Sequence, residues 1–66
     1  MKNRIRVARA EVRMTQQQLA EAIGVSRQTI NAIESGKFVP STVLALKMAN
    51  LFEKPVEELF ILDDQD

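Results

Sequence analysis

The stretch that decides the fold is residues 15–36, which read TQQQLAEAIGVSRQTINAIESG. Near its start, Thr15 precedes Gln18 by three residues. This is the spacing of a capping box, in which a hydroxyl and an amide bond otherwise unpaired backbone N–H groups at a helix start. The spacing therefore predicts a helix over about 16–23. The residues expected on its buried side are Leu19, Ala20 and Ile23.

A second helix follows almost at once. Gly24 ends the first helix, because glycine adopts the left-handed backbone conformation at almost no cost, and Ser26 is suited to cap the next one. This second helix is expected over about 27–35, with Gly36 as its terminator. A tight turn between two such helices makes the second one protrude at a fixed inclination. Its expected buried residues are Ile30 and Ile33.

The segments on either side of this pair predict three more helices. An N-terminal helix is expected over about 3–12, because Ile5, Ala8 and Val12 recur at offsets of three and four residues. The loop after the helix pair carries Phe38, which is expected to pack onto the core.

The C-terminal part of the chain continues the helical pattern. Ser41 is expected to cap a helix over about 42–52, the most apolar of the chain. Pro55 breaks that helix and suits the first turn of a short fifth one, and the apolar run 60–62 is typical of a short strand. Without a long linker or an internal repeat, residues 1–66 indicate one all-α, five-helix domain.

The composition argues against an enzyme and against a metal or cofactor site. The chain has no Cys and no His, which removes thiolate and imidazole ligands and the usual general base. The acidic residues near the C-terminus lack the ordered spacing of a calcium loop. These residues are Glu57, Glu58, Asp63, Asp64 and Asp66. No apolar run approaches the roughly 20 residues of a membrane span, and the N-terminus does not resemble a signal peptide, so a cytoplasmic protein is expected.

The charge is balanced overall but uneven along the chain. Up to Pro40 there are seven basic residues against three acidic ones, and after it two basic against six acidic ones. One reading is a basic binding face beside an acidic region that avoids a polyanion. The other is that a division along the sequence does not correspond to a division of the surface. Arg4, Arg6 and Arg13 either add long-range attraction to a polyanion or simply form the solvated face of their helix.

Taken together, the pattern Thr-Gln-x-x-Leu-Ala-x-x-x-Gly-Val-Ser-x-x-x-Ile-x-x-x-Glu-x-Gly resembles the phage Cro/repressor family of helix-turn-helix regulators. The resemblance covers nearly the whole chain and implies a lambda-repressor-like DNA-binding domain. The implied function is sequence-specific transcriptional regulation, foremost repression, with the helix that starts near Arg27 in the major groove of double-stranded DNA. Arg13 departs from the pattern, because many relatives have glycine there. Either this turn is not left-handed or Arg13 bears backbone strain.

The resemblance also implies roles for individual residues. Arg27 and Gln28 are expected to reach base edges, since arginine pairs with guanine O6 and N7 and glutamine with adenine N6 and N7. One of the two is an alternative phosphate contact. Asn31 and Ala32, one turn further on, are the other candidates for facing the groove, and Ala32 is suited to touch a thymine methyl group.

Phosphate contacts and a structural ion pair are implied as well. The candidate phosphate contacts are Gln16, Thr29, Ser35 and Lys37. Alternatively, Gln16 is an ordinary exposed residue in the first turn of its helix. Thr29 is either a phosphate contact or a surface residue without a role in binding. Arg9 and Glu34 match positions that form an ion pair between the first and third helices. Such a pair would orient the third helix, the one expected in the major groove.

An apolar end of the chain suggests a second copy. Phe60, Ile61 and Leu62 are hard to bury within so small a core, and pairing with another protomer would cover them. A two-fold homodimer would read two half-sites roughly 34 Å apart, so a near-palindromic operator is expected. The alternative function is an antitoxin-like or accessory protein that uses this fold to hold a protein partner. No small-molecule substrate is expected.

Overall fold

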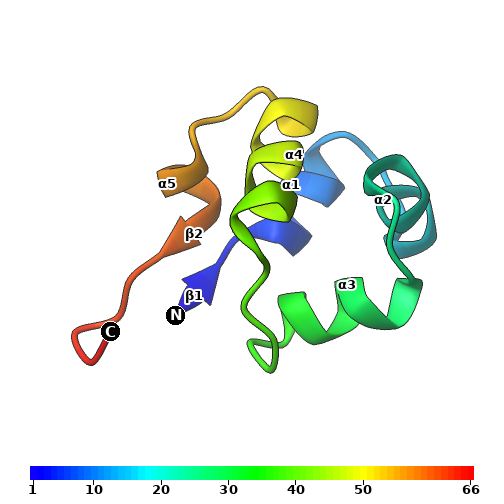
Figure 1. Cartoon of the computed structure of the whole chain (residues 1–66). Helices are drawn as coiled ribbons and strands as arrows, with labels where there is room; N and C mark the ends of the chain where they lie inside the picture. The colour runs from blue at the N-terminus through cyan, green and yellow to red at the C-terminus, as the bar shows by residue number, and fades with distance from the viewer.

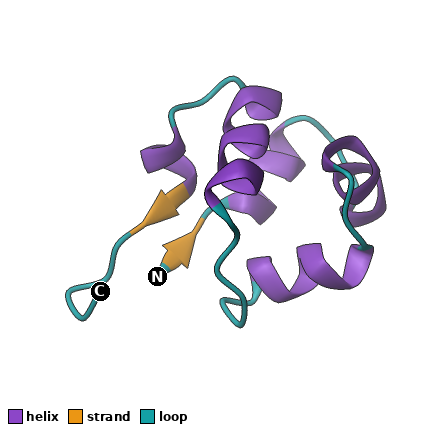
Figure 2. Ribbon diagram, viewed as in Figure 1, coloured by secondary structure: helices purple, strands orange, loops and turns teal.

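The computed structural model describes all 66 residues as five helices and one two-stranded sheet (Figure 1). The elements are, in chain order, β1 (Lys2–Asn3), α1 (Ile5–Glu11), α2 (Gln16–Ile23), α3 (Arg27–Glu34), α4 (Thr42–Phe52), α5 (Val56–Leu59) and β2 (Phe60–Ile61). The helices make up most of the chain, and the strands lie near the two termini (Figure 2). The predicted five-helix fold with a short C-terminal strand is confirmed. None of the helices is long and apolar enough to cross a membrane.

The local signals around the helix pair act as predicted. The Thr15 hydroxyl accepts a hydrogen bond from the Gln18 backbone N–H at 3.0 Å, and the Gln18 side chain accepts one from the Thr15 N–H at 2.8 Å. Gly24 has φ = 78° and ends α2, and the Ser26 hydroxyl caps α3 by accepting from the Thr29 N–H at 3.1 Å. Each cap uses only neighbouring residues, which is why it is readable from the sequence.

The end of α3 forms a Schellman motif. Gly36 adopts φ = 81°, and its N–H donates to the Ile33 carbonyl at 3.1 Å. The Lys37 N–H donates to the Ala32 carbonyl at 2.9 Å. These two bonds satisfy the last carbonyls of the helix and reverse the chain. Ser35 is therefore the C-cap, and α3 ends one residue before the predicted end.

All five helices contribute to one small core. Its ten buried residues are Ile5, Ala8, Leu19, Ala20, Ile23, Ile30, Ile33, Met48, Phe52 and Leu59. The buried sides predicted for α2 and α3 are confirmed. α4 crosses α1 in the view of Figure 1, and α3 runs along the edge of the molecule with its N-terminal end joined to α2 by the tight turn. The core therefore holds one side of α3 and leaves the other free.

Two packing predictions are wrong. Val12 lies beyond the end of α1, so it leaves the buried face and is 54% exposed. Phe38 is 46% exposed, because the chain reversal after α3 turns it outward.

Arg13 does adopt the left-handed conformation, with φ = 55°, which costs a non-glycine residue roughly 1 kcal/mol.

The two termini meet in the sheet. Antiparallel β1 and β2 pair Lys2 with Ile61 and Asn3 with Phe60, so α1 starts later than predicted, at Ile5. The Met1 ammonium group forms ion pairs with Asp63 at 2.9 Å and with Asp66 at 3.1 Å. This closure across the ends of the chain depends on long-range pairing that no local sequence signal specifies.

Candidate nucleic-acid interface

The free side of α3 carries the side chains that the sequence assigned to base edges. Arg27, Gln28 and Asn31 are exposed, and Ala32 is half-buried. This orientation follows from the core, because Ile30 and Ile33 are at most 1% exposed and define the opposite side of the helix. The structure therefore presents three polar side chains and one methyl group on a protruding helix.

Two adjoining hollows lie between the N-terminal end of α2 and the exposed side of α3. One is lined by Gln16, Arg27, Gln28 and Asn31. The other is lined by Arg9, Thr15, Gln16, Gln17 and Arg27. All of these lining side chains are polar, two are guanidinium groups and none is a carboxylate. Such a surface offers hydrogen-bond donors to an anion, and the N-terminal end of α2 adds the positive end of its helix dipole.

A buried carboxylate ties the three helices together behind this surface. The Glu34 side chain, at the end of α3, has no exposed area. It accepts two hydrogen bonds from Arg9 of α1, one through Nε and one through Nη2 at 3.1 Å. The amide of Gln16, the first residue of α2, donates to the same carboxylate at 3.1 Å. Because each helix supplies one partner, the network sets the inclination of α3.

Ionisation of Glu34 is maintained by these bonds. Burial alone would raise the pKa of Glu34, but the hydrogen bonds from Arg9, Gln16 and Arg6, together with the positive charge of Arg9, outweigh burial and lower the pKa from its ordinary value of 4.5. The hydrogen bond to Glu34 likewise raises the pKa of Arg9. Arg9 also donates from Nη1 to the Met14 carbonyl at 2.8 Å, so all three nitrogen atoms of its guanidinium group donate a hydrogen bond. The pair is therefore charged at neutral pH.

The residues assigned to phosphate contacts differ in whether their side chains already have hydrogen-bond partners. The Gln16 amide donates its second N–H to the Asn31 side chain at 3.4 Å, a long and weak bond that is easily exchanged for another acceptor. The Thr29 hydroxyl pairs with the Ser26 hydroxyl at 3.0 Å, and the Ser35 hydroxyl donates to the Ala32 carbonyl at 3.2 Å. Lys37 is exposed just beyond α3. These residues lie around α3, at both of its ends.

Sequence reasoning left Arg6 out of this site. Its Nε lies 3.5 Å from Glu34 Oε1, and its side chain is 70% exposed. Arg6 thus places an accessible guanidinium group beside the network. The available signal was its spacing, because Arg6 and Arg9 are three residues apart and share one face of α1.

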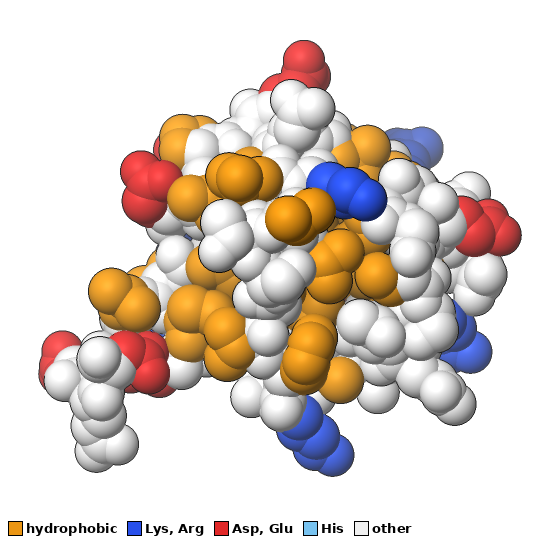
Figure 3. All heavy atoms as spheres, viewed as in Figure 1, with side chains coloured by type: hydrophobic (Ala, Val, Ile, Leu, Met, Phe, Trp, Pro, Cys, Tyr) orange, Lys and Arg blue, Asp and Glu red, His pale blue; other side chains and the backbone are white.

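Apolar side chains are exposed on another face of the molecule. Figure 3 shows them gathered over α4 and the segments beside it. The α4 residues Val43 and Leu46 are 61% and 56% exposed, and Leu62, beyond β2, is 75% exposed. Phe60 is half-buried against the protein's own core and Ile61 is 36% exposed, so intramolecular pairing covers part of the run assigned to a dimer interface.

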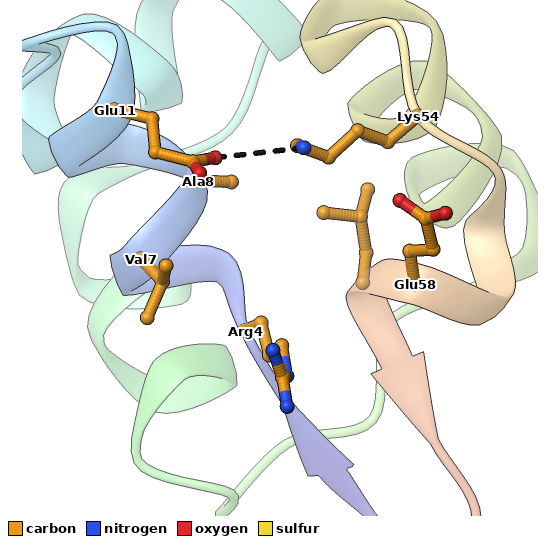
Figure 4. A pocket seen from close by; sticks show the side chains of 7 residues that line it. Arg4, Val7, Ala8, Glu11, Lys54 and Glu58 are labelled. Carbon is orange, nitrogen blue, oxygen red and sulfur yellow. Dashed lines mark ion pairs between the residues drawn. The ribbon is translucent and has the colours of Figure 1, made fainter.

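A small cavity lies away from α2 and α3. Its volume is about 80 Å³, and it is lined by Arg4 and by residues of α1, α5 and the segment between α4 and α5 (Figure 4). Lys54 and Glu11 form an ion pair at 3.5 Å across it. Sites for small-molecule ligands measure roughly 300–1,000 Å³, so this cavity has room for a few water molecules only.

Comparison with known proteins agrees with this geometry. The helix-turn-helix family model matches residues 5–59. Uncharacterized HTH-type transcriptional regulators from Archaeoglobus fulgidus and Methanocaldococcus jannaschii are each 48% identical over 66 residues, covering all of this chain and 94% and 100% of the relatives. One from Bacillus subtilis is 42% identical, with both chains fully covered.

Solved structures show the same fold. The restriction-modification controller protein C.AhdI from Aeromonas hydrophila superimposes with a TM-score of 0.78 at 32% identity, covering 86% of each chain. Bacillus thuringiensis PlcR, in complex with the peptide PapR7 and DNA, gives a TM-score of 0.75 at 30% identity, covering 91% of this chain and 22% of PlcR. The protein is thus a helix-turn-helix regulator. It belongs to the helix-turn-helix family and is of the Cro/repressor-like type.

Proposed function

We propose that this protein is a sequence-specific transcriptional regulator, a repressor, that binds double-stranded DNA by inserting α3 into the major groove. The observation that carries this proposal is the free side of α3, where Arg27, Gln28 and Asn31 are all exposed beside a polar hollow at the α2 N-terminus. A major groove about 12 Å wide admits a helix with such side chains. The similarity to PlcR, which was solved in complex with DNA, supports the same partner.

Each part of the interface has a proposed task. Arg27 and Gln28 read base edges, and Asn31 and Ala32 complete the reading surface one turn further on. The phosphate contacts around them hold α3 in register. The proposed phosphate contacts are Gln16, Thr29, Ser35 and Lys37. Gln16 would exchange its long bond to Asn31 for a phosphate oxygen and keep its bond to Glu34. Bound DNA would then be coupled to the network that sets the inclination of α3.

The length of α3 argues for a homodimer. Eight residues make a helix of about 12 Å, which spans only a few base pairs. A two-fold dimer doubles the length that is read and requires an inverted repeat. We place the contact at the β2 end, through Phe60, Ile61 and Leu62, because one edge of β2 is unpaired and Leu62 is 75% exposed. The net charge of zero leaves no overall repulsion between copies.

A lysine at the most exposed residue of this contact, Leu62, is expected to weaken self-association. For L62K we expect a dimer dissociation constant at least about ten times that of the wild type, because association would bury a charge without a partner. V12K is the matched control, since Val12 is also exposed, at 54%, and lies just beyond the end of α1 that is opposite β1. Sedimentation equilibrium of the three proteins measures the constants. Equal constants for L62K and the wild type would place the dimer contact elsewhere.

Selection from random duplexes tests the proposed function directly. Purified wild-type protein at near-physiological salt is expected to enrich an inverted repeat whose half-sites are about one helical turn apart. Circular dichroism of the same sample shows whether the protein is folded. Folded protein that enriches no sequence would contradict DNA reading. That result would favour the partner-binding alternative, for which the exposed apolar side chains of α4 are the specific feature.

A further inference from the structure

Gln28 separates two hollows of different chemistry on the free side of α3. The first is the polar hollow that it shares with Gln16, Arg27 and Asn31. The second, which we call the apolar notch, has a volume of about 300 Å³. The notch is lined by Ser26, Gln28, Thr29, Ala32 and Phe38. A base pair read by Gln28 would therefore have polar groups on one side of it and this notch on the other.

Phe38 reaches the notch because of how α3 ends. The Schellman motif at Gly36 reverses the chain, and the N–H groups of Lys37 and Phe38 both donate to the Ala32 carbonyl, at 2.9 and 3.2 Å. These bonds hold the Phe38 backbone against the last turn of α3. Its side chain stays 46% exposed and forms one wall of the notch. The exposed aromatic ring thus belongs to the surface that carries the base-reading residues.

The notch combines apolar side chains with polar groups, two of which are already hydrogen-bonded. The Ser26 and Thr29 hydroxyls bond each other at 3.0 Å, and Ser26 also caps α3. Ala32 and Phe38 contribute only a methyl group and a ring. The apolar part of the lining is therefore the Ala32 methyl group and the Phe38 ring, which lie beside the Gln28 amide and the paired Ser26 and Thr29 hydroxyls. Among the groups that base pairs present in the major groove, the apolar one is the C5-methyl group of thymine.

We infer that the apolar notch receives a thymine methyl group and that Phe38 is a specificity-determining residue for that thymine. The inference rests on the proposed function, since it requires α3 in the major groove. It adds a residue outside α3 to the reading surface. Burying one methyl group contributes about 0.8 kcal/mol, which corresponds to roughly a four-fold change in affinity.

Deoxyuridine, which lacks only the C5-methyl group, tests the inference. Each thymine of the selected repeat is replaced in turn, and binding is measured by fluorescence anisotropy for wild type, F38A and V39A. For the wild type, we expect one position per half-site to weaken binding about four-fold. For F38A, the thymine and deoxyuridine duplexes should bind within a factor of about two of each other. V39A, altered at an adjacent residue that is 62% exposed and outside the notch, should retain the wild-type difference.

The outcomes separate the inference from the proposed function. Specific binding without any deoxyuridine-sensitive position, or F38A with the full four-fold difference, would overturn the inference and leave the proposed function standing. Failure of the wild type to select any sequence would remove both. F38L keeps an apolar side chain and is expected to recover at least half of the deoxyuridine effect, which controls for a change in folding. If F38A bound every duplex as the wild type does, the inference would be overturned, and the exposed Phe38 ring would be a candidate contact for a protein partner instead.

Discussion

Replacing Arg27 and Gln28 together by alanine is expected to lower the affinity for the selected repeat at least about 30-fold. Each side chain can make a bidentate contact to a base, and such contacts discriminate by roughly 1–3 kcal/mol each. Binding to a scrambled duplex should fall much less, because non-specific affinity depends on phosphate neutralisation and only one positive charge is removed. Fluorescence anisotropy with both duplexes at the same salt concentration measures the two effects.

The matched control for this variant is R4A/N50A. It also removes one arginine and one amide, both exposed, but Arg4 lines the small cavity beside α5 and Asn50 lies in α4. The control should bind the repeat within a few-fold of the wild type. If R27A/Q28A weakened the specific and scrambled duplexes by the same factor, these residues would be phosphate contacts, and base reading by the start of α3 would be wrong.

Replacing Glu34 by alanine is expected to lower the free energy of unfolding by about 3 kcal/mol. The substitution leaves Arg9, whose side chain is only 15% exposed, without its carboxylate partner, and an uncompensated charge of this kind is costly. A chain of this length has a total stability of roughly 3–10 kcal/mol, so the loss is a large share of it. Urea denaturation followed by circular dichroism measures the change. A variant that replaces both partners, R9M/E34L, should lose less than E34A.

The same carboxylate makes part of the stability depend on pH. The folded-state pKa of Glu34 is lowered, so its contribution is fully present above the ordinary value of 4.5 and is lost as the pH falls through the folded-state pKa. The difference in unfolding free energy between wild type and E34Q should therefore be largest above about pH 4.5 and shrink at lower pH. Urea titrations at several pH values check this. A difference that stays constant down to acid pH would mean that the ionised form of Glu34 is not the source of its contribution to the unfolding free energy.

The helix pair was predictable because its signals are local. Thr15, Gln18, Gly24 and Ser26 each act through the backbone of residues within about four positions, so the sequence alone indicates where α2 and α3 begin and where α2 ends. The buried sides of both helices follow from helical periodicity for the same reason. The exposed residues at the start of α3 could then be identified as candidates for DNA contacts.

Features that depend on distant residues were not predictable in this way. Periodicity placed Val12 on a buried face, but the helix ends before it, and Phe38 was expected in the core although the chain reversal turns it outward. The contact of Arg6 with Glu34 joins residues that are 28 positions apart. The pairing of Asn3 with Phe60 connects the two ends of the chain. Side-chain type and spacing do not specify such pairings.

The sequence by itself thus determined the helix boundaries at the turn, the fold class and the candidate reading residues, because caps, turns and periodicity act over a few residues. Only the tertiary structure decided that Glu34 is bound by Arg9 and Gln16 at once and that Phe38 borders the reading surface. These features arise when helices from different parts of the chain share one small core, and the packing of that core places their side chains beside one another.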